Sequence, residues 1–232
     1  MPRLIEELDY RLTPMGPIAL RRRWVSALDL DVIEVILGDE HLMSSLFTVG
    51  ETELSNLGLA RHPGAGLKVL VGGLGLGYTA QAALAEPRVG SVEVVDTIEA
   101  VIDWHRTGLV PLGESLGSNP RCTLTHADFF GLFDGDGQDG TVWDVILLDI
   151  DHSPSRLLNP AHARLYTLDG LTRLRARLAP DGVFAMWSDD APDPGFMTLL
   201  EAVFPNPKAE VVTFPNPLTG AESTCTIYVT GG

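Results

Sequence analysis

Residues 68–79 read KVLVGGLGLGYT, a short apolar run followed by a cluster of glycines. The β-branched run Val69–Val71 and the alanine-rich residues 80–85 indicate a strand, a tight turn and then a helix. Glycine permits positive φ angles and lets a ligand approach the backbone closely. The first N–H groups of the helix would face a ligand bound over the turn. The stretch therefore predicts a site for a nucleotide-like ligand at Gly72, Gly73, Gly75 and Gly77.

Strand and helix patterns alternate from this stretch to the end of the chain. The expected strands cover residues 69–71, 91–95, 122–125, 143–148, 183–187, 210–214 and 224–229. The helices expected between them cover residues 80–85, 98–106, 161–178 and 196–204. The loop between the last two strands is too short for a crossover helix, so these strands must pair antiparallel. The pattern predicts an α/β, Rossmann-like class I methyltransferase fold with a seven-stranded, mostly parallel sheet and an antiparallel C-terminal hairpin.

The N-terminal part of the chain has a different pattern. Strands are expected at 18–23, 31–37 and 41–47, and a lead-in helix at 51–60. We therefore predict two units: a small β appendage with its helix, residues 1–60, and the Rossmann-like domain, residues 61–232. The unpaired strand edges of the appendage could be covered by a second copy of the chain, so we also expect a homodimer.

The charge of the chain narrows the range of partners. The 232 residues include 16 basic and 31 acidic side chains, which give a formal charge of −15. This balance argues against nucleic acid or an anionic membrane as a partner, because both require a basic face. It permits a cationic small molecule, although acidity also simply keeps proteins soluble.

The remaining composition indicates a cytoplasmic protein without a metal. The two cysteines, Cys122 and Cys225, fit neither a metal-ligand spacing nor a disulfide framework, which favours a reducing compartment. We find no apolar export signal and no run long enough to span a bilayer. The acidic loop Asp134–Gly140 resembles a calcium-binding loop only slightly, because no glutamate closes the ligand set.

Aspartates follow three successive strands of the predicted sheet: Asp96, Asp128 and Asp149. The carboxyl ends of parallel strands meet at the edge of the sheet where ligands bind. Asp96 could accept hydrogen bonds from two ribose hydroxyls, and Asp128 from an exocyclic adenine amine. Asp149 could attract a sulfonium or ammonium centre. Each aspartate alone also fits turn or helix-cap chemistry, but the three together predict a nucleoside site.

A second cluster follows the fourth strand of this sheet. Asp149, Asp151 and His152 are the candidate catalytic residues. A protonated amine has no free lone pair, so an amine acceptor needs a base, and a histidine with an ordinary pKa of about 6.5 could serve. The same residues also fit a purely loop-shaping role. Trp187, at the end of the fifth strand, could wall the acceptor pocket and attract a cation, or simply pack in the core.

These motifs resemble the spermidine synthase-like group of class I S-adenosylmethionine-dependent transferases. The resemblance implies S-adenosylmethionine, or its decarboxylated form, held by the four glycines and by Asp96, Asp128 and Asp149. The N-terminal appendage is similar to the group's N-terminal hairpin domain, which implies that Glu40 binds substrate together with Trp187. The resemblance covers Val69–Val229 and rests on Gly72–Gly77, Asp96, Ala127-Asp128, Trp143–Asp149, Leu178–Phe184 and Gly38-Asp39-Glu40.

Three departures from aminopropyltransferases determine the expected reaction. Gly75 stands where those enzymes have an aspartate, His152 replaces a diamine-binding aspartate, and Met43-Ser44 replaces a Tyr-His pair. We therefore predict transfer of a methyl group from S-adenosylmethionine to a small amine-bearing or cationic acceptor. The alternatives are aminopropyl transfer from decarboxylated S-adenosylmethionine to a polyamine, and a non-catalytic nucleoside-binding homologue.

Overall fold

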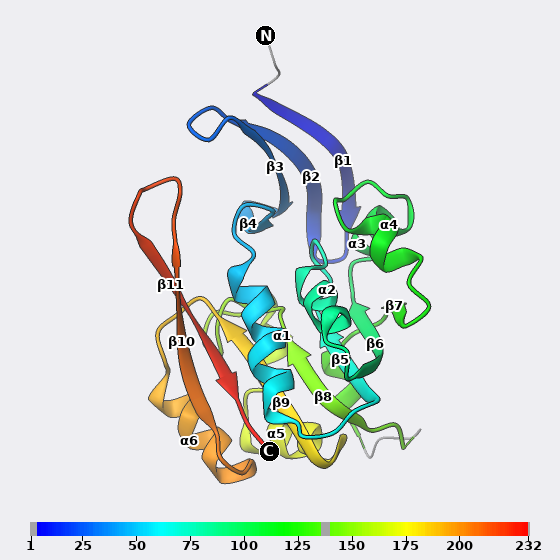
Figure 1. The fold of residues 1–232 in the computed structure, drawn as a ribbon, viewed down its shortest axis with the longest axis vertical. Coiled ribbons are helices and arrows are strands. Elements are labelled where there is room, and N and C mark those ends of the chain that lie inside the picture. Colours follow the sequence, from blue (N-terminus) through cyan, green and yellow to red (C-terminus); the bar gives the residue numbers. More distant parts are fainter. Residues whose placement is uncertain (1–3, 136–139, 232) are drawn as a thin grey trace.

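Seven strands form the central sheet: β5 (Leu67–Gly72), β6 (Val89–Asp96), β7 (Cys122–His126), β8 (Trp143–Leu148), β9 (Leu178–Ser188), β10 (Lys208–Pro215) and β11 (Glu222–Val229). The computed structural model describes residues 4–135 and 140–231. The strand order is β10-β11-β9-β8-β5-β6-β7 (Figure 1). Neighbours from β9 to β7 run parallel, whereas β11 pairs antiparallel with both β9 and β10. The predicted fold class is confirmed.

Helices pack on both faces of this sheet. They are α1 (Val49–Arg61), α2 (Tyr78–Ala85), α3 (Glu99–Arg106), α4 (Gly113–Gly117), α5 (Leu168–Arg175) and α6 (Pro194–Val203), with short 3-10 helices η1 (Phe130–Phe133) and η2 (Pro160–Arg164). Alternate residues of β8 separate the two cores. Val145 and Leu147 pack with residues of α1, α2 and α3, whereas Ile146 and Leu148 pack with residues of α5 and α6. Both faces of the parallel strands are therefore apolar, as burial on two sides requires.

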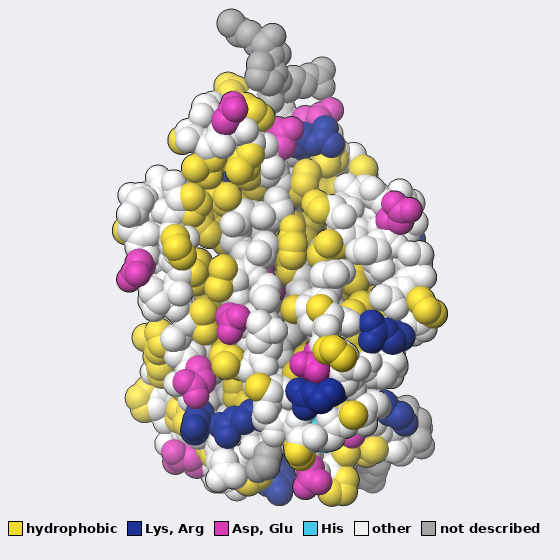
Figure 2. Space-filling view, in the orientation of Figure 1, with side chains coloured by type: hydrophobic (Ala, Val, Ile, Leu, Met, Phe, Trp, Pro, Cys, Tyr) yellow, Lys and Arg dark blue, Asp and Glu magenta, His cyan; other side chains and the backbone are white. Residues whose placement is uncertain are grey.

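The N-terminal sheet has four antiparallel strands in the order β1 (Ile5–Thr13), β2 (Gly16–Val25), β3 (Leu30–Leu37) and β4 (Glu40–Ser44). Our sequence interpretation missed β1 and extended β4 to residue 47. The pairing register of β1 with β2 shifts between Glu7 and Asp9, and this irregularity breaks the alternation that marks a strand in sequence. Hydrophobic side chains gather on the upper part of the face shown in Figure 2, over this sheet.

The two sheets share one hydrophobic core. Ile18, Leu20 and Val35 of the N-terminal sheet belong to the same buried cluster as residues of α1, α2 and α3. Polar contacts add to this packing, since the indole N–H of Trp104 on α3 donates to the carboxylate of Asp9 at 2.6 Å. Helix α1 packs against β9, β11 and α2, although the predicted division after residue 60 assigns it to the N-terminal unit. That division stays a prediction.

One expected helix is wrong. Residues 161–178 form η2 and α5 rather than one continuous helix, and residue 178 already belongs to β9. The hydroxyl of Thr167 caps α5 by accepting from the amide of Gly170, which starts a new helix there. A Cβ on Gly170 would overlap the carbonyl oxygen of Arg164, so the glycine also permits the close approach of the two segments.

Two further sequence expectations concern loops and membranes. Residues 136–139 of the expected acidic loop lie outside the described part of the chain. Among the described residues, no helix combines the length and the hydropathy that crossing a bilayer needs.

Candidate active site

A cavity of about 580 Å³ lies at the carboxyl ends of the parallel strands. Its walls come from the loop after β5, the ends of β6, β8 and β9, the first turn of α1, β4 and the far end of the β10–β11 hairpin. This position is where ligands bind in open α/β sheets, and the volume suits a small-molecule ligand. The sequence interpretation placed the site at this edge but missed the wall that the hairpin supplies through Phe214, Asn216, Ser223 and Cys225.

The glycine loop follows β5 as a left-handed turn. Gly73, Gly75 and Gly77 have φ angles of 94°, 47° and 93°. A Cβ on Gly73 would overlap the carbonyl oxygen of Asp149, so only glycine fits at this position. The sequence thus predicted a turn that glycine alone can make, and two of its glycines, Gly73 and Gly75, line the cavity.

Four of the five backbone amides of residues 73–77 already have a partner. Gly73 N donates to Val95 O, and Gly77 N donates to Leu74 O. The amide of Leu74 donates to the carboxylate of Asp96 at 2.9 Å. The amide of Leu76 donates to the sulfur of Met43 at 3.0 Å. The loop can pack against a ligand, but these four amides are not free to bind an anion.

Asp96 lies at the end of β6 and at the wall of the cavity. Its Oδ2 accepts from Leu74 N at 2.9 Å and its Oδ1 from Ile98 N at 2.8 Å. Burial raises the pKa of this carboxyl, and the backbone amides of Leu74, Ile98 and Gly75 oppose that rise. Each oxygen keeps a second lone pair, so the predicted bonds to ribose hydroxyls are compatible with this geometry.

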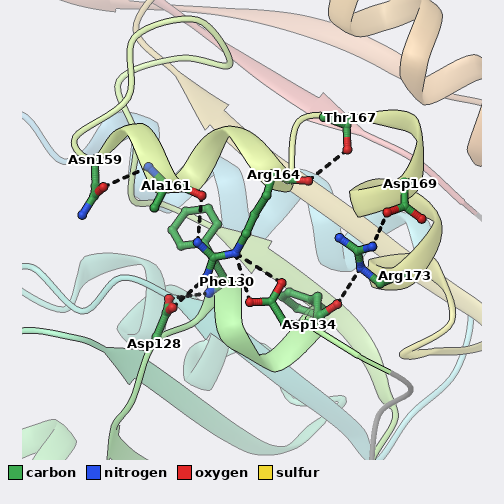
Figure 3. A network of polar contacts seen from close by, with 10 residues as sticks. Asp128, Phe130, Asp134, Asn159, Ala161, Arg164, Thr167, Asp169 and Arg173 are labelled. Carbon is green, nitrogen blue, oxygen red and sulfur yellow. Dashed lines mark hydrogen bonds and ion pairs between the residues drawn. The ribbon is translucent and has the colours of Figure 1, made fainter.

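Asp128 follows β7 and is held in place by Arg164. Oδ1 accepts from Phe130 N at 2.9 Å, and Oδ2 pairs with Nη2 of Arg164 at 2.8 Å. Figure 3 shows Arg164 reaching both Asp128 and Asp134, while its Nη1 donates to the carbonyl of Ala161. Phe130, which lines the same wall, stacks on His162 with ring centroids 3.8 Å apart. The structure thus places an aspartate and an aromatic wall where an adenine was predicted.

Asp149 and Glu51 form a pair of carboxyl groups in the cavity wall. Asp149 follows β8, and its Oδ2 accepts from the hydroxyl of Thr79 at 2.6 Å. Burial raises the pKa of Asp149 to about 6, against the effect of the Thr79 hydrogen bond. Burial and the charge of Asp149 raise the pKa of Glu51 to about 8. In the described part of the chain, no lysine, arginine or histidine pairs with either group within 4.0 Å.

Our sequence interpretation missed Glu51. Its only local signal is a place in the first turn of a helix, where a glutamate is ordinary helix-end chemistry. Helix α1 precedes the glycine motif and crosses the sheet, so tertiary packing alone brings Glu51 to Asp149. The same applies to Thr79, whose hydroxyl is directed to Asp149 by the start of α2.

Replacing Glu51 by glutamine should change how stability depends on pH. The pKa of Glu51 rises from its ordinary 4.5 to about 8 on folding, so between these values the folded protein binds more protons than the unfolded chain. The free energy of unfolding of the wild type therefore falls as pH rises through this window. Glutamine does not titrate, so Glu51→Gln does not show this decrease. Urea unfolding at about pH 5 and about pH 9 measures the free energy of unfolding. The difference between Glu51→Gln and the wild type should shift in favour of the variant at the higher pH.

Glu53→Gln serves as the matched control for that measurement. Glu53 lies on the same helix, hydrogen-bonds Asn56 and is absent from the cavity wall. Its variant should follow the wild type at both pH values. Equal pH dependence of wild type and Glu51→Gln would contradict the assigned environment of Glu51.

The structure separates the two other candidate catalytic residues. His152 lines the cavity, and its Nε2 lies 3.4 Å from Oε2 of Glu40 at the rim. Asp151 is buried and is not part of the cavity wall. Its carboxylate accepts from the amide of Leu158, pairs with Nδ1 of His162 and accepts from the hydroxyl of Tyr166, each at 2.8 Å. Asp151 therefore supports the wall through His162 rather than facing a ligand.

Aromatic side chains enclose the Glu51–Asp149 pair. Trp187 and Tyr78 line the cavity, and a Cβ on Gly50 would meet the indole nitrogen of Trp187 at 2.5 Å. Phe47 and Phe214 also line the cavity, with ring centroids 6.4 Å apart. Aromatic faces beside carboxylates favour a cationic ligand. Glu40 does not line the cavity and contacts it only through His152.

The wall of the cavity is strongly acidic. Among the described residues, six side chains with carboxyl groups and three histidines line it, and no lysine or arginine does: Glu51, Asp96, Asp128, Asp149, Asp189 and Glu222, with His41, His152 and His162. This composition fits the acidic balance of the whole chain and favours ligands that carry positive charge.

Sequence comparisons identify no relative, and structural comparisons identify the fold. No protein-family model matches the chain, and no curated protein sequence matches it. A spermidine synthase solved in complex with the transition-state analogue AdoDATO is similar at TM-score 0.75 and 18% identity, over 97% of this chain and 73% of that one. A spermidine synthase from Thermotoga maritima is similar at TM-score 0.72 and 18% identity, over 97% and 72%. The chain thus has the spermidine synthase fold, including the N-terminal sheet.

Proposed function

We propose that this protein transfers an aminopropyl group from decarboxylated S-adenosylmethionine to an amine acceptor. The observation that carries the proposal is the acidic wall, to which residues 4–135 and 140–231 contribute six carboxyl side chains and no lysine or arginine. S-adenosylmethionine carries a carboxylate that needs a cation or free amides, whereas its decarboxylated form carries only cations at that end. The likeness to spermidine synthases, one of them bound to AdoDATO, supports the same choice.

The glycine loop gives the proposal a second argument. In methyl transfer, the amino acid end of S-adenosylmethionine would lie near this turn, where backbone N–H groups could bind its carboxylate. Here four of the five amides of residues 73–77 are already bonded within the protein. The ranking of the two reactions that we drew from the sequence is therefore reversed.

The proposed reaction is an in-line displacement. The nitrogen of the acceptor amine attacks the propyl carbon next to the sulfonium, the C–N bond forms and the C–S bond breaks. Its electron pair stays on sulfur, so neutral 5′-methylthioadenosine leaves. Asp149 takes the proton that the amine loses, because its raised pKa makes it a better base than an ordinary aspartate while it stays ionised near neutral pH. Positioning and electrostatics supply the rest of the catalysis.

Asp96 and Asp128 are proposed to bind the nucleoside. Asp96 would accept from the ribose hydroxyls, and Asp128, fixed by Arg164, from the adenine amine. His152 and Trp187 would contact the acceptor, with Glu40 holding His152 at the rim. The edge strand β1 exposes Ile5, Tyr10 and Leu12, and we propose that a second copy covers it in a cytoplasmic homodimer.

Methyl transfer remains the second candidate because of Gly75. This residue lacks the side-chain carboxylate that would repel the methionine carboxylate, and the Gly73-x-Gly75-x-Gly77 spacing fits methyltransferases. The product distinguishes the two reactions. Purified protein should release 5′-methylthioadenosine from the decarboxylated cofactor when spermidine, putrescine or a related amine is present. Release of S-adenosylhomocysteine from S-adenosylmethionine instead would favour methyl transfer, and no product from either would favour a non-catalytic binding protein.

A further inference from the structure

Met43 occupies the side of the glycine loop where residue 75 would direct a side chain. A Cβ on Gly75 would overlap the sulfur of Met43, and that sulfur accepts the amide of Leu76 at 3.0 Å. The thioether thus packs on the loop and completes its hydrogen bonding. No carboxylate can reach the ligand from position 75 while Met43 holds this place.

Glu51 brings a carboxylate into the cavity from another element. It lies in the first turn of α1, beside Gly50, which packs against Trp187. Burial and the charge of Glu51 raise the pKa of Tyr78, the first residue of α2 after the glycine turn, and burial and the charge of Asp149 raise the pKa of Glu51. Glu51 therefore lies among Trp187, Tyr78 and Asp149, where the glycine turn meets the end of β8.

We propose that Glu51 binds the primary ammonium group of the transferred aminopropyl arm, and that it thereby selects the decarboxylated cofactor. This inference rests on the proposed function. The ammonium supplies the cation that the Glu51–Asp149 pair lacks in the described protein. A cofactor that keeps its carboxylate would add a further negative charge beside this pair, and like charges in a largely desolvated site repel strongly.

The protonation of the pair supports this role. Glu51 holds a proton when the cavity contains no cation, because burial and Asp149 raise its pKa. An arriving ammonium stabilises the carboxylate and releases that proton. Binding of the decarboxylated cofactor should therefore be coupled to proton release near neutral pH.

Calorimetry of three ligands on four proteins tests the inference. The ligands are S-adenosylmethionine, its decarboxylated form and neutral 5′-methylthioadenosine, and the proteins are wild type, Glu51→Gln, Glu51→Asp and Glu53→Gln. In wild type the decarboxylated form should bind more tightly than S-adenosylmethionine. Glu51→Gln should reduce this preference about tenfold or more, because it removes one partner of a charge pair. Both cofactors carry the sulfonium, so its contribution cancels in the ratio of the two Kd values.

The neutral ligand and the control variants test whether the effect is specific to Glu51 and whether the cavity stays folded. Affinity for 5′-methylthioadenosine should change less than about threefold in Glu51→Gln, which shows that the cavity is intact. Glu51→Asp should recover part of the preference, and Glu53→Gln should keep all of it. An unchanged preference in Glu51→Gln, or an equal loss in Glu53→Gln, overturns the role of Glu51 while aminopropyl transfer persists. Tighter binding of S-adenosylmethionine by the wild type overturns the proposed function itself and the role of Glu51 with it.

Discussion

Asp149→Asn is expected to lower kcat about 10²- to 10⁴-fold, the range for removal of a general base. Asparagine keeps the shape of the side chain and a carbonyl oxygen for the Thr79 hydroxyl, which donates to Asp149 at 2.6 Å. It cannot take a proton from the acceptor amine. Binding of 5′-methylthioadenosine should change little, because this ligand carries no charge that Asp149 must neutralise.

The measurement is release of 5′-methylthioadenosine, followed by chromatography over a range of pH. Wild-type activity should rise with pH through about 6, as Asp149 loses its proton. Asp144→Asn is the matched control: Asp144 lies on the same strand, at its opposite end, and accepts the amide of Lys68. A kcat for Asp149→Asn within tenfold of the kcat of the control would exclude Asp149 as the base. Tenfold corresponds to about 1.4 kcal/mol of activation free energy.

Gly73→Ala should abolish cofactor binding and destabilise the fold. Two costs add at this position, since the residue has a φ of 94° and the new Cβ would overlap the carbonyl oxygen of Asp149. Left-handed strain and overpacking each cost on the order of 1–3 kcal/mol, so a loss of about 3 kcal/mol or more is expected. Urea unfolding and titration with 5′-methylthioadenosine measure the two effects.

Gly66→Ala is the control that separates the cost of left-handed backbone strain from the cost of steric overlap. Gly66 precedes β5 with a φ of 72°, and no atom lies within 4 Å of the position that a Cβ would take there. The Gly66→Ala variant should therefore lose only about 1 kcal/mol in free energy of unfolding and keep full ligand affinity. If Gly73→Ala and Gly66→Ala lose equal stability and both bind 5′-methylthioadenosine, the close approach of Gly73 to Asp149 is not required for ligand binding.

The sequence predicts the central sheet well because its signals are local. The glycine turn, the strand-terminal aspartates and the short final loop each specify a backbone feature within a few residues. Parallel topology then brings Asp96, Asp128 and Asp149 to one cavity without further information. Strand β1 was missed because an irregularity near Asp9 and its charged residues hide the alternating pattern.

The missed site residues lie on elements whose placement depends on packing. Glu51 precedes the glycine motif by more than twenty residues, and its place in the first turn of a helix indicates no ligand. Met43 also precedes that motif, and its contact with the glycine loop depends on how the N-terminal sheet packs. Asp151 shows the reverse error: it stands beside His152 in sequence, but its side chain turns inward to His162 and Tyr166. Adjacent residues at a strand end can face opposite directions, so sequence proximity alone does not assign a residue to a cavity.

The hydrophobic core that the two sheets share makes the chain a single cooperative unit. Ile18, Leu20 and Val35 pack in the same cluster as Leu54 and Val69, so unfolding the N-terminal sheet would expose the upper core of the central domain as well. A ligand in the cavity contacts both parts and therefore stabilises both at once. We therefore expect the N-terminal sheet to unfold, and to gain stability from a bound ligand, together with the central domain.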